Sequence, residues 1–178
     1  MNTKHRTNAR AARGFTLLEL IIVLAVMAIL VAWGFPSLEE SMKNNRMVAQ
    51  NNEMVAMLQY ARSEAIRRNT SVEVHLSAEG NEWEAYIDDP DNMADVEGCV
   101  QGQLRCAENE RVAMAADTGL ITFNNRGYIR DFGEGWTPET LFLQHESCNG
   151  NSQRRRIDIM PTGQISSCSL ACGSEAGC

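Results

Sequence analysis

The sequence contains few of the residue patterns that catalysis or metal binding uses. Only three histidines occur among 178 residues, His5, His75 and His145, and none accompanies a Ser or Cys nucleophile motif. The acid-rich stretch IDDPDNMADVE, which begins at Ile87, lacks the ligand order of an EF-hand and its Gly at the sixth position. We therefore expect no catalytic centre, no cofactor and no metal site.

Basic residues are scarce beyond the first 14 positions. Residues 1–14 carry four basic side chains and no acidic one, although the whole chain has a net charge of −7. The remainder holds 12 basic and 23 acidic residues, which is a net charge of −11. A body this acidic does not attract nucleic acid or an anionic membrane through its overall field.

Charged residues are almost absent between Phe15 and Phe35, where Glu19 is the exception. A run of about 20 apolar residues spans a bilayer as a helix, and basic residues before it keep that end in the cytoplasm. Residues 36–178 then lie outside the cytoplasm. A carboxylate in such a helix costs roughly 2.5–3.5 kcal/mol on insertion scales, and less near an interface, so its presence predicts a role for Glu19.

In an ordinary secretory signal, an A-x-A-like cleavage triplet follows the apolar stretch. No such triplet follows the apolar run of this chain. The small residue is Gly14, directly before Phe15, and cleavage between them leaves the helix on the mature chain. The new amine of Phe15 then lies about 6 Å along the helix from Glu19. Staggered helices in a bundle can pair the Glu19 carboxylate of one subunit with this amine of the next.

All cysteines lie in the second half of the chain. An even number in one polar region indicates disulfides in an oxidising compartment. Zinc is the alternative, but no CxxC pair is present. The six residues are Cys99, Cys106, Cys148, Cys168, Cys172 and Cys178.

Hydrophobic periodicity predicts an α+β fold, with a long amino-terminal helix followed by an antiparallel sheet. The helix should end near Asn69, after Arg67 and Arg68. Its apolar stripe consists of Met47, Met54, Val55, Leu58, Ala61, Ala65 and Ile66, with Asn51 as the one polar member.

Beyond Asn69 the period changes to two, and alternation predicts strands in SVEVHLS and EWEAYID. A hairpin is expected around a turn at 124–127, with a second strand at 128–129. TLFLQHES and RRRIDIMPTGQIS supply further strands, the last turning at 161–163. The acidic segment between about 88 and 118 is interpreted as a surface loop.

The stretch RGFTLLELIIVLAVMAILVAWGFP resembles the amino terminus of type IV pilins and type II secretion pseudopilins. The matching positions are Gly14, Phe15, Thr16, Glu19 and Pro36. The resemblance implies that prepilin peptidase cleaves after Gly14 and methylates the amine of Phe15. It also implies assembly through Glu19 and the helix up to Pro36, where the missing amide hydrogen is expected to kink the helix.

Three later stretches, MLQYARSEAIRRN, ITFNNRGYI and RRRIDIMPTGQI, are similar to the minor pilin family that includes FimT, FimU and GspH. The implied organisation is a leader at 1–14, a helix at 15–69 that crosses the membrane over 15–36, and a periplasmic β-rich head at 70–178 with a Cys-rich tail. The implied location is the inner membrane and then the pilus tip. The implied partners are other minor pilins and the major pilin.

Two other functions stay open. Some FimT-like pilins bind DNA through a Gly-Arg-x-Arg stretch, but the corresponding stretch of this chain is Gly163, Gln164, Ile165 and Ser166. A replacement patch would consist of Arg126, Arg130, Arg154, Arg155 and Arg156. The other alternative is a minor pseudopilin of a type II secretion system.

The cysteines are expected to form local staples. Cys99 and Cys106 enclose a short loop, and Cys148 and Cys168 flank strands that antiparallel pairing brings together. Cys172 and Cys178 would then close the tail. These pairs are one of 15 connectivities that six cysteines allow.

Overall fold

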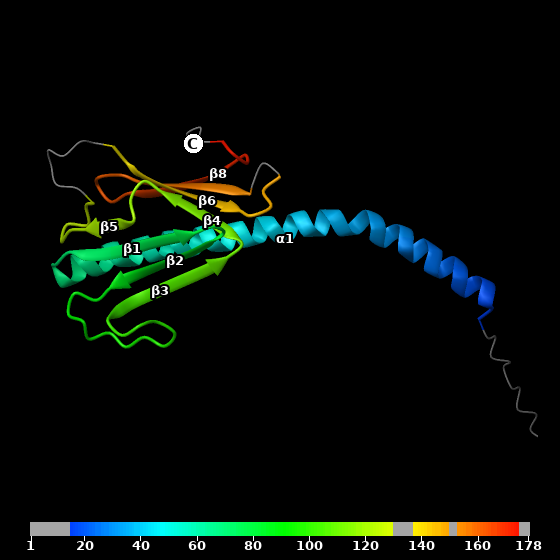
Figure 1. Cartoon of the computed structure of the whole chain (residues 1–178), viewed down its shortest axis with the longest axis horizontal. Helices are drawn as coiled ribbons and strands as arrows, with labels where there is room; N and C mark the ends of the chain where they lie inside the picture. Colours follow the sequence, from blue (N-terminus) through cyan, green and yellow to red (C-terminus); the bar gives the residue numbers. More distant parts are fainter. Residues whose placement is uncertain (1–14, 130–136, 150–152, 175–178) are drawn as a thin grey trace, which may run out of the picture. The chain divides into compact units, whose positions relative to one another are not determined.

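We describe a computed structural model of residues 15–129, 137–149 and 153–174, without the side chain of Pro36. Gly14, Arg130 and Cys178 lie outside the described residues. The chain divides into two compact units, residues 1–40 and 41–178, which are treated separately. The elements are α1 (Leu17–Arg68), β1 (Val72–Glu79), β2 (Glu82–Asp88), β3 (Gln103–Glu110), β4 (Val112–Ala116), β5 (Leu120–Phe123), β6 (Glu139–His145), β7 (Arg154–Ile159) and β8 (Ile165–Leu170) (Figure 1).

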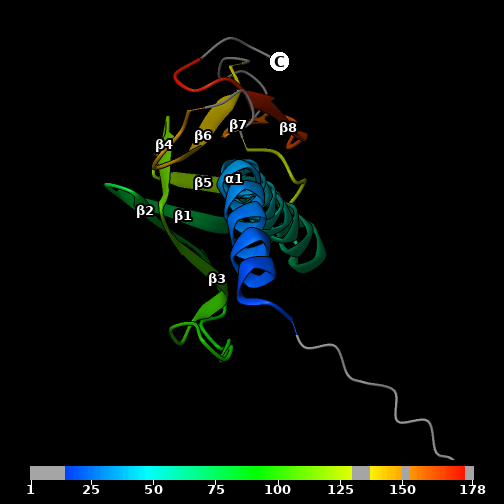
Figure 2. The same cartoon turned by 90° about the vertical axis from the view of Figure 1, so that its right-hand side faces the viewer.

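The strands form two four-stranded antiparallel sheets in the second unit. Sheet A has the order β3-β2-β1-β5, and sheet B has the order β4-β6-β7-β8. The two sheets and the carboxyl-terminal part of α1 surround one core (Figure 2). The expected α+β fold is therefore confirmed.

The core joins one face of α1 to the inward faces of both sheets. Met47, Met54 and Met57 are fully buried. The methionine side chain is flexible, so it can fill the irregular space between a helix and two sheets. The predicted alternation is also seen in β1 and β2, where the inward residues are buried. Ile66 was expected in the buried stripe but is half-exposed.

The helix ends where the sequence predicts. Asn69 adopts a left-handed conformation with φ of 54°. Its N–H donates to the Ile66 carbonyl, and the Thr70 N–H donates to the Ala65 carbonyl. This pair of bonds is a Schellman motif, which satisfies carbonyls that the end of a helix leaves without partners.

The segment between 88 and 118 is not a loop throughout, because it contains β3 and β4. The inward positions of β3 include Gln103 and Ala107, and these do not produce a strong alternation of large apolar residues. In β4, Val112 and Met114 are buried on a strand of only five residues. Hydrophobic periodicity therefore does not predict strands that are short or that have small or polar inward residues.

The expected second strand of the hairpin at 128–129 is also absent from the described residues. The turn itself forms, since the Gly127 N–H donates to the Asn124 carbonyl. The Ile129 N–H, however, donates to the Pro161 carbonyl at 3.1 Å instead of pairing with β5. The chain beyond the turn thus joins the turn at 161–163.

Arg62 connects these two turns to α1. Its Nε donates to the Gly127 carbonyl at 3.0 Å, and its Nη2 donates to the Thr162 carbonyl at 3.4 Å. Gly163 lies in the same junction with φ of 75°, and a Cβ there would lie 1.8 Å from the Gly127 carbonyl oxygen. The close approach of the two turns therefore requires glycine at 163.

Gly163→Ala should destabilise the head more than Gly80→Ala does. Both residues have positive φ, so both alanines incur roughly 1–2 kcal/mol of conformational strain. Nothing lies within 4 Å of a Cβ at Gly80, whereas the clash at Gly163 adds about 1–3 kcal/mol. Denaturant unfolding of residues 41–178 measures both changes, and equal losses would contradict the proposed close packing.

Candidate functional site

The first unit presents a continuous apolar helical surface. Every described side chain from Phe15 to Phe35 is exposed, including Phe15, Leu17 and Trp33. α1 is long and apolar enough to cross a membrane, and the apolar window that passes this test has no buried part. So large an exposed apolar surface is a site for lipid or for other protein chains.

Glu19 lies in the first turn of α1 and belongs to a capping arrangement. Its backbone N–H donates to the Thr16 hydroxyl at 3.2 Å. Thr16 is therefore the N-cap, and Glu19 occupies the third helical position, as in the sequence pattern of a capping box. A carboxylate at this end also interacts favourably with the helix dipole. The spacing of Thr16 and Glu19 in TLLE is the sequence signal for this cap.

Pro36 does not end the helix. The helical assignment of α1 continues through this position to Arg68. The Ser37 hydroxyl donates to the Gly34 carbonyl at 3.0 Å, next to this point. The kink expected at Pro36 stays a prediction.

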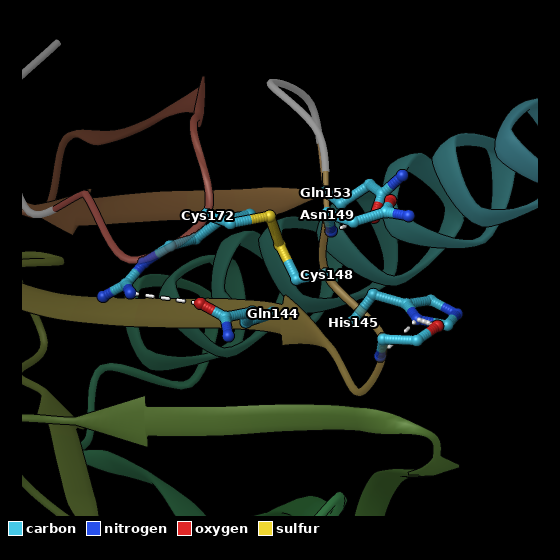
Figure 3. Close-up of a disulfide and its surroundings, with 8 residues drawn as sticks. Gln144, His145, Cys148, Asn149, Gln153 and Cys172 are labelled. Atoms are coloured by element: carbon cyan, nitrogen blue, oxygen red, sulfur yellow. Dashed lines mark hydrogen bonds between the residues drawn. A yellow bond between two sulfur atoms is a disulfide. The ribbon is translucent and has the colours of Figure 1, made fainter.

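Two disulfides are described in the head. Cys99 pairs with Cys106, as the sequence analysis expects. Cys148 pairs with Cys172, so the expected Cys148–Cys168 and Cys172–Cys178 pairs are both wrong. Cys168 is disulfide-bonded to another residue. Figure 3 shows the Cys148–Cys172 bridge between the segment after β6 and the segment after β8.

Strand register explains the observed pairing. Within sheet B, Cys168 pairs with Arg156 of β7, and Arg156 pairs with Phe142 of β6. Cys168 thus lies inside β8, two strands from β6, whereas Cys148 lies beyond the end of β6. Strands β6 and β8 run in the same direction, because both are antiparallel to β7. Their carboxyl ends therefore meet, and the Cα atoms of Cys148 and Cys172 are 5.8 Å apart.

The segment between β2 and β3, which includes Cys99, is also anchored to the end of α1. The buried Asp89 carboxylate accepts the N–H groups of Met93 at 2.8 Å and Ala94 at 2.7 Å, and it pairs with Arg68. Burial alone raises the pKa of Asp89, but the backbone N–H groups and Arg68 outweigh it and hold the pKa below its ordinary value. The charged carboxylate is therefore the form that holds the loop.

Arg68 also contacts the buried carboxylate of Glu64, with Nε 2.9 Å from Oε2. Hydrogen bonds from Arg67, and then from Arg68, lower the pKa of Glu64 despite its burial. The last turn of α1 thus holds one acidic residue between two basic ones. Through Asp89, the same network reaches the loop between β2 and β3.

His145 is buried at the end of β6, and its Nδ1 lies 3.2 Å from both the N–H and the hydroxyl of Ser147 (Figure 3). Burial is the main reason that the pKa of His145 is lowered, and Lys43 and Arg46 of α1 add to the effect. The side chain is therefore neutral in the folded protein at neutral pH. It packs as a structural residue and not as an acid or base exposed to a substrate.

The arginines of the expected basic patch do not share one face. Along β7, Arg154 and Arg156 point to one side of sheet B, and Arg155, which lies between them, points to the other side. The guanidinium carbons of Arg154 and Arg156 lie 4.5 Å and 5.8 Å from the centre of the Phe142 ring. Arg156 also pairs with Asp158 at 2.8 Å. Arg126 lies elsewhere, in the exposed turn after β5.

The exposed apolar segment and the head, in which a helix packs with two antiparallel sheets, define a pilin-like subunit. Residues 50–163 match the family described as type II transport protein GspH, and residues 9–35 match the prokaryotic N-terminal methylation motif. The first match spans nearly two thirds of the chain, and the chain therefore belongs to the GspH family. Subunits of this family are structural minor pilins or pseudopilins and not enzymes.

Two solved structures are similar to this chain. The type IV minor pilin FimU of Pseudomonas aeruginosa strain PAO1 is 19% identical with a TM-score of 0.47, and the match covers 68% of this chain and 87% of FimU. The minor pseudopilin EpsH from the Type 2 Secretion System of Vibrio cholerae is 12% identical with a TM-score of 0.46, covering 71% of this chain and 97% of EpsH. No curated protein matches the chain.

Peptide mapping without reduction should recover the Cys99–Cys106 and Cys148–Cys172 bridges. Removal of the second bridge by a Cys148→Ser and Cys172→Ser double substitution should lower the free energy of unfolding by about 2–4 kcal/mol, because the unfolded chain gains freedom. A peptide that joins Cys148 to Cys168 would contradict the register argument.

Acidification should release the loop that Asp89 holds. Because its folded-state pKa is depressed, the stabilisation is complete above the ordinary value of 3.8 and is lost as the pH falls through the folded value. Asp89→Asn should lower the free energy of unfolding at neutral pH by roughly 1.5–3 kcal/mol. Below about pH 4, the free energy of unfolding of the variant should also decrease less with falling pH than that of the wild type. Unfolding of residues 41–178 at several pH values measures this.

The matched control is Asp91→Asn. Asp91 also contacts Arg68, but its side chain is 67% exposed, so its loss should change stability by less than about 1 kcal/mol. Equal pH profiles for wild type and Asp89→Asn would refute the assignment to Asp89.

Proposed function

We propose that this protein is a minor type IV pilin, cleaved after Gly14, that assembles through its amino-terminal helix into the initiating or tip complex of a pilus. The observation that carries the proposal is the apolar surface of residues 15–35, whose side chains are all exposed. Before assembly this surface lies in the inner membrane. After assembly, sister helices replace the lipid around it.

Glu19 makes assembly favourable over residence in lipid. A carboxylate near the end of a membrane helix is costly without a cationic partner. Cleavage after Gly14 by prepilin peptidase supplies such a partner, the amine of Phe15 on a neighbouring subunit. Since Thr16 already caps the backbone of the first turn, the Glu19 carboxylate can serve this intermolecular pair.

The head supplies the surface that other pilins contact. Disulfides close the loop before β3 and join the tail to the end of β6, so these surfaces stay ordered in the oxidising periplasm. The neighbours we propose are other minor pilins and the major pilin.

The family match favours a second candidate, a minor pseudopilin of a type II secretion system. The matching family is described as type II transport protein GspH, and the match covers residues 50–163, which include most of the head. Both candidates use the same helix and the same processing. They differ in the subunits that neighbour this protein.

DNA uptake receives less support. Arg154 and Arg156 already contact Phe142, and Arg156 pairs with Asp158. Because of these contacts, the two guanidinium groups are less available to bind phosphate than those of arginines without such partners. A gel shift at low salt tests the remaining possibility.

Glu19→Gln should leave cleavage after Gly14 largely intact and reduce incorporation into filaments at least about tenfold, because the charge pair is lost. The ratio of protein in sheared filaments to processed protein in the membrane measures this. Glu40→Gln is the matched control, since Glu40 is an exposed acidic residue of α1 outside the apolar run. Wild-type incorporation of Glu19→Gln would contradict the proposal.

Copurification of crosslinked, processed protein separates the two candidates. Recovery of the major pilin and other minor pilins supports the pilus assignment. Recovery of secretion pseudopilins instead supports the second candidate and refutes the first.

A further inference from the structure

Three metal-ligating side chains meet on the outer face of sheet A. Glu73 and His75 are two residues apart on β1 and therefore point to the same side, and Asp88 ends the neighbouring strand β2. The His75 Nε2 atom lies 2.8 Å from Asp88 Oδ2 and 3.7 Å from Glu73 Oε2. One ligand atom from each residue lies within 4.8 Å of the other two.

Strand pairing brings the two carboxylates together. Glu73 and Asp88 lie next to the Val74–Ile87 pair, where the β1–β2 pairing ends, and their carboxylate oxygens are within 4.8 Å of each other. Like charges in opposing positions destabilise a sheet. Among the described residues, His75 is the only ion-pair partner of either carboxylate, and it must be protonated to neutralise even one of them. A divalent cation neutralises both.

The imidazole is held in place for this role. Its ring stacks on Tyr86 of β2, with the ring centres 4.6 Å apart and the planes 9° from parallel. The contact fixes the ring between the two strands and directs Nε2 towards the carboxylates. Side-chain exposures of 31% for His75, 46% for Glu73 and 47% for Asp88 leave the cluster open for an ion to enter.

We propose that Glu73, His75 and Asp88 bind one divalent first-row transition-metal ion, with Zn²⁺ as the representative. Ligands at about 2.0–2.2 Å from one ion lie roughly 3–4 Å from each other, so small side-chain rotations suffice to bind it. An imidazole nitrogen with two carboxylates suits these ions, whereas Ca²⁺ and Mg²⁺ prefer oxygen ligands alone. Three protein ligands leave one position for water, and the bound ion links β1 to β2.

The test is a calorimetric titration of the full chain in detergent micelles, without an affinity tag, with Zn²⁺ alone. We expect one site per chain that His75→Gln and Asp88→Asn each weaken at least tenfold. Glu84→Gln is the matched control, because Glu84 lies on the same face of β2 and loses the same charge but is not a ligand. Its affinity should equal that of the wild type.

Three results would overturn the proposal. One is no Zn²⁺ binding by the wild type at millimolar concentration. Another is equal binding by wild type and His75→Gln. The third is Ca²⁺ affinity equal to that for Zn²⁺, which indicates a site made of carboxylates alone. Thermal unfolding of each variant shows that the fold is kept, and Zn²⁺ should raise the midpoint of wild type and Glu84→Gln only.

Discussion

A single helix has to satisfy two environments, and the rest of the structure depends on this constraint. The 52 residues of α1 include an apolar portion whose described side chains are exposed and a later portion whose face forms the centre of the core. The hydrophobic effect therefore folds the head around the second portion, whereas the side chains of the first portion stay exposed. An exposed apolar surface of this size is a site for lipid or for other protein chains.

The three later stretches that resemble minor pilins meet at one point of the head. Arg62 belongs to the first stretch, Gly127 to the second and Thr162 to the third, and Arg62 donates to the carbonyls of both other residues. A guanidinium has several donors in a fixed plane, so one side chain can satisfy two turns at once. One residue from each of the three stretches thus takes part in holding the end of the helix to the turns beside both sheets.

Sequence patterns predict the parts of this fold that repeat regularly. The helix end, β1 and β2 follow from apolar periodicity and from Asn69, because burial selects large apolar residues at fixed spacing. β3 was missed because Gln103 and Ala107 occupy its inward positions. The Cys148–Cys172 pair and the cluster at His75 depend on strand register, which brings together residues 24 and 13 positions apart. No local pattern encodes that register.

The two sheets present different outer faces. On sheet A, Glu82 pairs with both Glu79 and Glu110, and Glu84 pairs with Glu108. Much of the acidic excess of the chain is therefore concentrated on one surface, where it opposes any approach of nucleic acid. On sheet B, arginines pack on Phe142, and the Cys148–Cys172 bridge holds the tail to the end of β6. A neighbouring subunit that docks on sheet A must bring positive charge or leave these carboxylates in water, so charge selects the partner for that face.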